Sequence, residues 1–115
     1  MNHGLRVLLI EDNPDDRFLT IRELQREFGR VEVEQITDRR GFEQALESGE
    51  FDVVITDYQL RWGNGLEVLR EIKKRNPYMP VIMFTGTGNE EIAVEAMKSG
   101  LDDYVIKSPI HLKRL

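Results

Sequence analysis

Short apolar segments alternate with longer amphipathic segments along this chain. Residues 5–10, 53–55, 81–84 and 104–106 are each almost continuous in apolar side chains. Runs this short, most of them followed by a helical pattern, are typical of strands buried on both faces of a parallel sheet. Residues 31–34, Val-Glu-Val-Glu, alternate strictly. That alternation indicates an edge strand with one face in water.

The segments between these strands carry helix signals. In the first, Asn13 is a good N-cap, Pro14 suits the first helical position, and Gly29 provides a stop. Apolar side chains recur at helical spacing in this segment, at Phe18, Ile21, Leu24 and Phe28. The later helices are predicted to follow Asp38 and Asn89 and to begin near Leu66; they end at Gly49, Asn76-Pro77 and Gly100.

The pattern is β-α repeated four times and then a fifth strand. It predicts one α/β domain over residues 1–115, a doubly wound five-stranded parallel sheet with helices on both faces. The strand order expected for such a sheet is 2-1-3-4-5. Residues 109–115 would open a fifth helix but supply only about two turns at 3.6 residues per turn. The fifth helix is therefore expected to be truncated.

Composition narrows the class of protein. With 40% hydrophobic and 32% charged residues, the chain has the balance of a soluble globular protein. The absence of cysteine excludes a disulfide framework and thiol catalysis, and it is compatible with a reducing cytoplasm. No apolar run approaches the roughly 20 residues of a membrane span. The net charge of −5 argues against nucleic-acid binding by this domain alone.

Polar side chains stand where four of the five predicted strands end. Glu11 and Asp12 follow the first strand, Asp57 the third, Thr85 the fourth and Lys107 the fifth. Because the carboxyl ends of parallel strands meet at one edge of the sheet, and ligands bind there, we expect these side chains to lie together.

Three carboxylates at one edge repel one another, and a positive charge is needed to offset this repulsion. Two unit charges roughly 5 Å apart repel by roughly 3 kcal/mol at an effective dielectric of about 20. Mg²⁺, which prefers oxygen ligands and retains several waters, would remove this cost. The set suits a phosphoryl group: the metal and Lys107 would neutralise its oxygens, Thr85 would donate a hydrogen bond, and Asp57 would attack phosphorus.

Four motifs carry a resemblance to a known family over essentially the whole chain. They are Val7-Leu8-Leu9-Ile10-Glu11-Asp12-Asn13, Asp57 with Gly65-Leu66-Glu67-Val68-Leu69, Phe84-Thr85-Gly86, and Gly100-Leu101-Asp102-Asp103-Tyr104-Val105-Ile106-Lys107. In this order they resemble the receiver domains of two-component response regulators. The resemblance implies a flavodoxin- or CheY-like fold and a cytoplasmic phosphorelay protein that catalyses only its own phosphorylation and dephosphorylation.

The resemblance also implies roles for individual residues. Asp57 would accept a phosphoryl group from a histidine kinase or histidine phosphotransfer protein. Mg²⁺ would be bound directly by Asp12, Asp57 and the backbone carbonyl of Gln59, and by Glu11 through water. Lys107 would hold the phosphoryl group.

Thr85 and Tyr104 would form a switch pair, in which Thr85 moves toward the phosphoryl group and Tyr104 turns inward. The changed surface would then signal to a downstream protein or a fused output domain. A homodimer is compatible with this function.

The sequence departs from the family pattern at two places. Arg61 stands where the family often has proline, which predicts a less rigid loop after Asp57. Ser108 separates Lys107 from Pro109, whereas the family usually has a cis proline directly after the lysine. A cis bond before a residue other than proline would cost about 3–4 kcal/mol, so the sequence does not predict a cis bond between Lys107 and Ser108.

Other interpretations stay open from sequence. The chain is alternatively a pseudo-receiver, a protein-binding module that never uses phosphorylation. An aspartyl-nucleophile phosphatase of the haloacid dehalogenase type is disfavoured, because such enzymes need an aspartate two residues after the nucleophile, where this chain has Gln59. Tyr104 is either a switch or an ordinary half-buried aromatic residue. Trp62 either covers the core or contacts a partner.

Overall fold

A computed structural model describes residues 4–86 and 89–107. The predicted fifth helix at residues 109–115 and the geometry around Ser108 and Pro109 lie outside these described residues.

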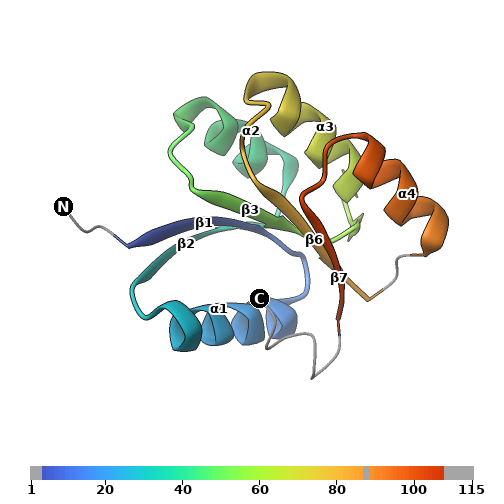
Figure 1. The fold of residues 1–115 in the computed structure, drawn as a ribbon. Helices are drawn as coiled ribbons and strands as arrows, with labels where there is room; N and C mark the ends of the chain where they lie inside the picture. Colours follow the sequence, from blue (N-terminus) through green and yellow to red (C-terminus); the bar gives the residue numbers. More distant parts are fainter. Residues whose placement is uncertain (1–3, 87–88, 108–115) are drawn as a thin grey trace.

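Five parallel strands form the central sheet (Figure 1). They are β1 (Leu5–Ile10), β2 (Val31–Ile36), β3 (Val53–Thr56), β6 (Val81–Thr85) and β7 (Asp103–Ile106). Their order in the sheet is β2-β1-β3-β6-β7, which confirms the predicted order 2-1-3-4-5. The strand β2 is an edge strand and alternates between half-buried and exposed side chains over most of its length, as its sequence predicts.

Helices cover both faces of the sheet (Figure 1). Helix α1 (Pro14–Phe28) lies on one face, and α2 (Arg39–Ser48), α3 (Gly65–Arg75) and α4 (Glu90–Lys98) lie on the other. Successive residues of a strand point to opposite faces. In β1, Leu8 and Ile10 accordingly join the core under α2, α3 and α4, and Val7 and Leu9 join the core under α1.

The predicted helix ends are present in the structure. The Asn13 side chain accepts hydrogen bonds from the backbone N–H groups of Asp15 and Asp16, and this fixes the start of α1. Gly29 ends α1 with a φ of 70°, a conformation that favours glycine.

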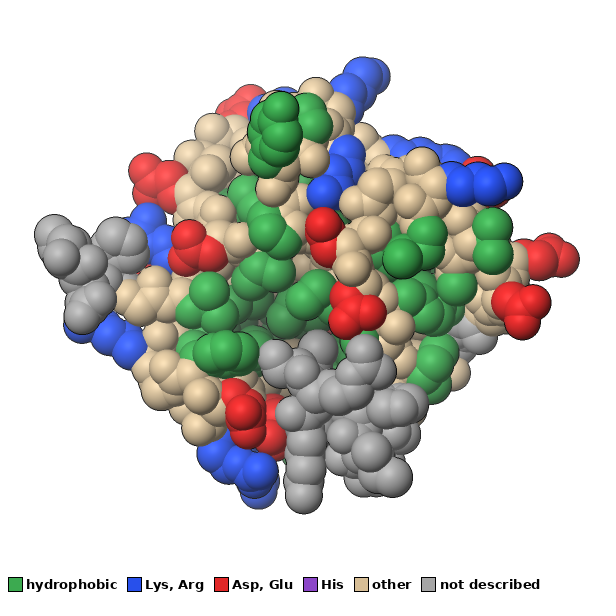
Figure 2. All heavy atoms as spheres, in the orientation of Figure 1, with side chains coloured by type: hydrophobic (Ala, Val, Ile, Leu, Met, Phe, Trp, Pro, Cys, Tyr) green, Lys and Arg blue, Asp and Glu red, His purple; other side chains and the backbone are tan. Residues whose placement is uncertain are grey.

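Helix α1 buries only part of the stripe that its apolar spacing predicts: Leu24 is in the core and Ile21 packs against it. Thr20, Glu23 and Leu24 are buried, while Phe18 and Phe28 are 63% and 52% exposed. Among the described residues, α1 is the only helix on its face of the sheet, so its outer flank has no neighbouring helix to pack against. Hydrophobic side chains also reach the surface across the middle of the face seen in Figure 2.

The segment between β3 and α3 is more ordered than a loop. Strands β4 (Gln59–Leu60) and β5 (Gly63–Asn64) pair antiparallel as a small hairpin, which the sequence did not predict. Helix α3 begins at Gly65, one residue before the expected start, because Asn64 caps the helix through its bond from the Glu67 N–H. Within the described ranges, no helix is both long enough and apolar enough to cross a membrane.

Candidate functional site

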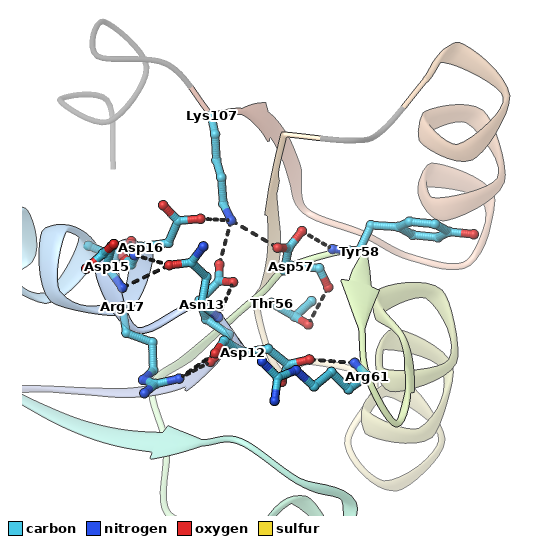
Figure 3. Close-up of polar contacts among 12 residues, drawn as sticks. Asp12, Asn13, Asp15, Asp16, Arg17, Thr56, Asp57, Tyr58, Arg61 and Lys107 are labelled. Carbon is cyan, nitrogen blue, oxygen red and sulfur yellow. Dashed lines mark hydrogen bonds and ion pairs between the residues drawn. The ribbon is translucent and has the colours of Figure 1, made fainter.

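Three of the predicted site residues, Asp12, Asp57 and Lys107, are seen together at the carboxyl edge of the sheet (Figure 3). Ile10 of β1 pairs with Thr56 of β3, so Glu11 and Asp57, which follow them, leave neighbouring strands at the same level. The Asp57 N–H donates to the Ile10 carbonyl over 3.0 Å. Strand register therefore brings the acids of the first and third strands together.

Lys107 is the centre of the site. Its Nζ lies 2.7 Å from Glu11 Oε1, 2.9 Å from Asp57 Oδ2 and 2.8 Å from Asp16 Oδ2. Glu11 and Asp57 come from strand ends, as predicted, whereas Asp16 comes from the first turn of α1. The sequence analysis did not include Asp16 in the site. The available signal was its place in the first turn of a helix that starts at the end of β1.

The charges in this cluster shift one another. Burial, together with repulsion from Asp57, raises the pKa of Glu11 to about 7, although Lys107 opposes that rise. Burial would lower the pKa of Lys107, but hydrogen bonds to Asp16, Glu11 and Asp57 outweigh it and raise that pKa. The lysine therefore carries its charge. Because three carboxylates share this charge, it does not fully offset the desolvation of Glu11, the most buried of them.

The Asp57 carboxylate is held at both oxygens. Oδ2 accepts from Lys107, and Oδ1 accepts from the Tyr58 N–H over 2.7 Å. The backbone behind it is fixed by the buried Thr56 hydroxyl, which donates to the Asp57 carbonyl over 2.9 Å. Gly65 lies directly against this segment: its N–H donates to the Tyr58 carbonyl over 2.6 Å, and a Cβ at Gly65 would overlap the Asp57 carbonyl oxygen.

Asp12 is linked to the loop that follows Asp57. Its Oδ2 accepts a hydrogen bond from the backbone N–H of Arg61. A proline at position 61 has no N–H and could not make this bond. Arg61, where the family often has proline, thus anchors the loop through its N–H. The sequence had predicted a less rigid loop at this position. Arg17 donates to the main-chain carbonyls of Glu11 and Asp12 over 2.8 and 3.0 Å and holds the end of β1.

Among the acidic residues, Asp12 offers an oxygen ligand for a hard divalent cation. Its Oδ1 is buried and has no hydrogen-bond partner within the described part of the chain, so it is available as a ligand. Mg²⁺ is commonly bound by one or two carboxylates and several waters. No group of three acidic or histidine side chains among the described residues is arranged to hold a metal; the three carboxylates that converge do so on Lys107 Nζ.

Thr85 and Tyr104 lie on neighbouring strands beside the site. Thr85 is fully buried at the end of β6, and its carbonyl accepts the Lys107 N–H over 2.9 Å. The Tyr104 hydroxyl oxygen is buried and has no hydrogen-bond partner among the residues that the structure describes. Burial, and then the proximity of Tyr58 and Asp57, raise the pKa of Tyr104. The Gln59 side chain is exposed in β4, and the role proposed for its carbonyl stays a prediction.

Trp62 packs onto the core beneath the hairpin. Its ring lies 5.6 Å from the Phe42 ring, centroid to centroid, and it contacts the core under α2 and α3. This position favours the interpretation that Trp62 covers the core.

Comparison with known proteins identifies relatives over nearly the whole chain. The sequence model of the response regulator receiver domain matches residues 7–115. The response regulator protein PilR of Pseudomonas aeruginosa is 34% identical over 112 residues, which are 96% of this chain and 24% of PilR. The chain thus spans about a quarter of the length of that relative.

Two solved structures show the same fold. A CheY-like receiver domain protein from Methanospirillum hungatei has a TM-score of 0.83 and 27% identity, and the match covers 96% of this chain and 86% of that one. The phosphorylated cyanobacterial phytochrome response regulator RcpA also has a TM-score of 0.83 and 27% identity, covering 99% of this chain and 86% of its own.

Proposed function

The chain belongs to the response regulator receiver domain family, and we propose that Asp57 is its phosphoacceptor. Receiver domains are signalling domains of two-component systems. The observation that carries the assignment is the charged Lys107 ammonium 2.9 Å from Asp57 Oδ2, in an otherwise acidic edge. An aspartate at this edge that only capped a turn would not need a half-buried lysine beside it.

The proposed reaction is a phosphoryl transfer between two proteins. A carboxylate oxygen of Asp57 forms a bond to phosphorus, and the bond from phosphorus to the imidazole nitrogen of a phosphohistidine breaks, with its electron pair leaving on the imidazole. The donor is a histidine kinase or a histidine phosphotransfer protein. Lys107 then donates to a phosphoryl oxygen in place of the Asp57 oxygen.

The residues also fit the proposed cation. Asp12, through its free Oδ1, and Asp57 would hold Mg²⁺, with the Gln59 carbonyl as a further ligand and Glu11 acting through water. The cation would neutralise charge on the transferring phosphoryl group. Asp57 supplies the nucleophile, and Lys107 supplies a fixed positive charge on the phosphoryl group.

Signalling would follow from a shift between two conformations. Phosphoryl oxygens would draw the Thr85 hydroxyl, and Tyr104 would settle in its inward position. A ligand or modification shifts such an equilibrium only by its different affinity for the two states. The buried Tyr104 hydroxyl, which has no hydrogen-bond partner among the described residues, supports this proposal, because an unpaired buried hydroxyl is costly and a rearrangement that gave it a partner would be favoured.

The output lies beyond the receiver fold. PilR is more than four times as long as the matched segment, and we propose that this chain likewise signals to a downstream protein or a fused output domain. Residues 1–115 as one receiver domain and a cytoplasmic location remain predictions.

The test is phosphoryl labelling measured by intact mass. The purified chain is incubated with acetyl phosphate or a phosphohistidine donor, with Mg²⁺ or with EDTA. We expect one added phosphoryl group that requires Mg²⁺ and is lost in Asp57→Asn. The matched control is Asp15→Asn, which removes the same charge from an exposed position of α1.

Three results would contradict the proposal. Labelling of Asp57→Asn at the wild-type level would show that another residue is the acceptor. An unlabelled wild-type chain that also fails to bind millimolar Mg²⁺ would identify a phosphorylation-independent interaction module. Turnover of a general phosphomonoester that depends on Asp57 would instead indicate a phosphatase.

A further inference from the structure

The hydrogen-bonding capacity of Lys107 is fully used in this structure. An ammonium group has three N–H donors. Its three acceptors are Glu11 at 2.7 Å, Asp16 at 2.8 Å and Asp57 at 2.9 Å. Asp16 is the only one of these that comes from a helix, so it links the site to α1 (Figure 3).

The backbone of Asp16 is held in place for this contact. Its N–H donates to the Asn13 side chain over 3.1 Å, and its carbonyl accepts the Thr20 hydroxyl over 2.7 Å. The Asp16 side chain is 35% exposed, whereas that of Lys107 is only 18% exposed. The pair therefore lies at the mouth of the site, between water and the buried carboxylates. The neighbouring Asp15 is exposed and makes no contact with Lys107.

We propose that Asp16 is a positioning residue that holds Lys107 toward α1 and thereby slows phosphoryl transfer to Asp57. The inference rests on the proposed function. An incoming phosphoryl group carries negative charge and needs a share of the Lys107 ammonium. Asp16 competes for that share and adds one more negative charge beside the reacting oxygen. The contact would make the receiver less responsive to small phosphodonors.

Asp16→Asn separates the charge from the hydrogen bond, because the amide oxygen still accepts from Lys107. We expect the second-order rate of labelling by acetyl phosphate to rise by about three- to fivefold, the upper part of the range that a partly exposed charge pair produces. Asp15→Asn is the matched control, with the same change of net charge in the same helical turn. Its rate is expected to stay within about twofold of wild type, since exposed charges are strongly screened.

A second arm tests whether the effect passes through Lys107. Each Asp16 and Asp15 variant is also made in a Lys107→Gln background, and the excess of Asp16→Asn over Asp15→Asn is expected to disappear there. Asp16→Glu, which restores the charge within reach of Lys107, is expected to restore a rate near wild type. Thermal unfolding of each variant shows that the fold is retained.

The outcomes separate the two proposals. Equal rates for Asp16→Asn and Asp15→Asn, with Asp57 still labelled, overturn the role of Asp16 and leave the phosphoacceptor in place. If Asp16→Asn is still labelled faster than Asp15→Asn in the Lys107→Gln background, the proposed role of Asp16 is also overturned. A wild-type chain that no donor labels overturns the proposed function, and the role of Asp16 with it.

Discussion

Two residues of the predicted site carry buried polar atoms that have no hydrogen-bond partner among the described residues. They are Asp12, through Oδ1, and Tyr104, through its hydroxyl. A buried polar group left without a hydrogen bond costs about 1–3 kcal/mol, and such groups are rare in native proteins. For Asp12 the proposed cation supplies the missing partner. For Tyr104, a conformational change that gave the hydroxyl a hydrogen-bond partner would remove this cost.

Removing the Tyr104 hydroxyl should therefore stabilise the protein. We expect Tyr104→Phe to raise the free energy of unfolding by about 1 kcal/mol, because the unpaired group disappears and the ring stays. Urea denaturation without Mg²⁺ measures the change. Tyr78→Phe, at a side chain that is 91% exposed, is the control and should have no effect. A Tyr104→Phe protein that is less stable than wild type would show that the hydroxyl is bonded in solution.

At the scale of elements, the sequence predicted the strands and helix starts that local residue patterns determine. The strands follow from apolar runs and the helix ends from Asn13, Asp38 and Asn89, all of which cap as expected. The hairpin of β4 and β5 was missed because two-residue strands show no alternation. The contact of Asp16 was missed because it joins residues 91 positions apart, and side-chain contacts of this range depend on tertiary packing.

The hairpin depends on Gly65, where α3 begins against the backbone of Asp57. We expect Gly65→Ala to lower the free energy of unfolding by about 1–3 kcal/mol, as overpacking does, and to slow labelling of Asp57. Gly63→Ala is the control in the same hairpin, since its Cβ would meet only the movable Glu67 Oε1, at 2.9 Å. Unfolding curves and labelling rates compare the two variants. Equal behaviour would mean that the close approach at Gly65 does not matter.

At the scale of the whole molecule, folding concentrates acids from separate elements. Glu11 and Asp12 follow β1, Asp16 lies in α1 and Asp57 follows β3. Within the described ranges, Lys107 is the only cationic side chain bound to the carboxylates of Glu11, Asp16 and Asp57. Sequence reasoning predicted most of this gathering, because parallel strands end at one edge. The sequence did not predict which three carboxylates accept hydrogen bonds from Lys107.

Mg²⁺ should stabilise this arrangement more than a neutral salt does. At ten times its dissociation constant, a ligand that binds only the folded state adds about 1.4 kcal/mol to the free energy of unfolding. We therefore expect the melting temperature to rise by several degrees in MgCl₂ compared with NaCl of equal ionic strength. Asp12→Asn should reduce that difference. An equal rise in both salts would indicate general screening in place of a bound cation.

The three hydrogen bonds of Lys107 also determine the stage of protein synthesis at which the site can form. Lys107 lies 96 positions after Glu11, 91 after Asp16 and 50 after Asp57. A chain emerging from the ribosome presents these three acids long before it supplies Lys107, and contacts of such separation close late in folding. We expect ribosome-stalled chains that expose only the residues before Lys107 to resist labelling by a phosphodonor. The receiver would then become chemically competent only once β7 and the lysine after it have been made.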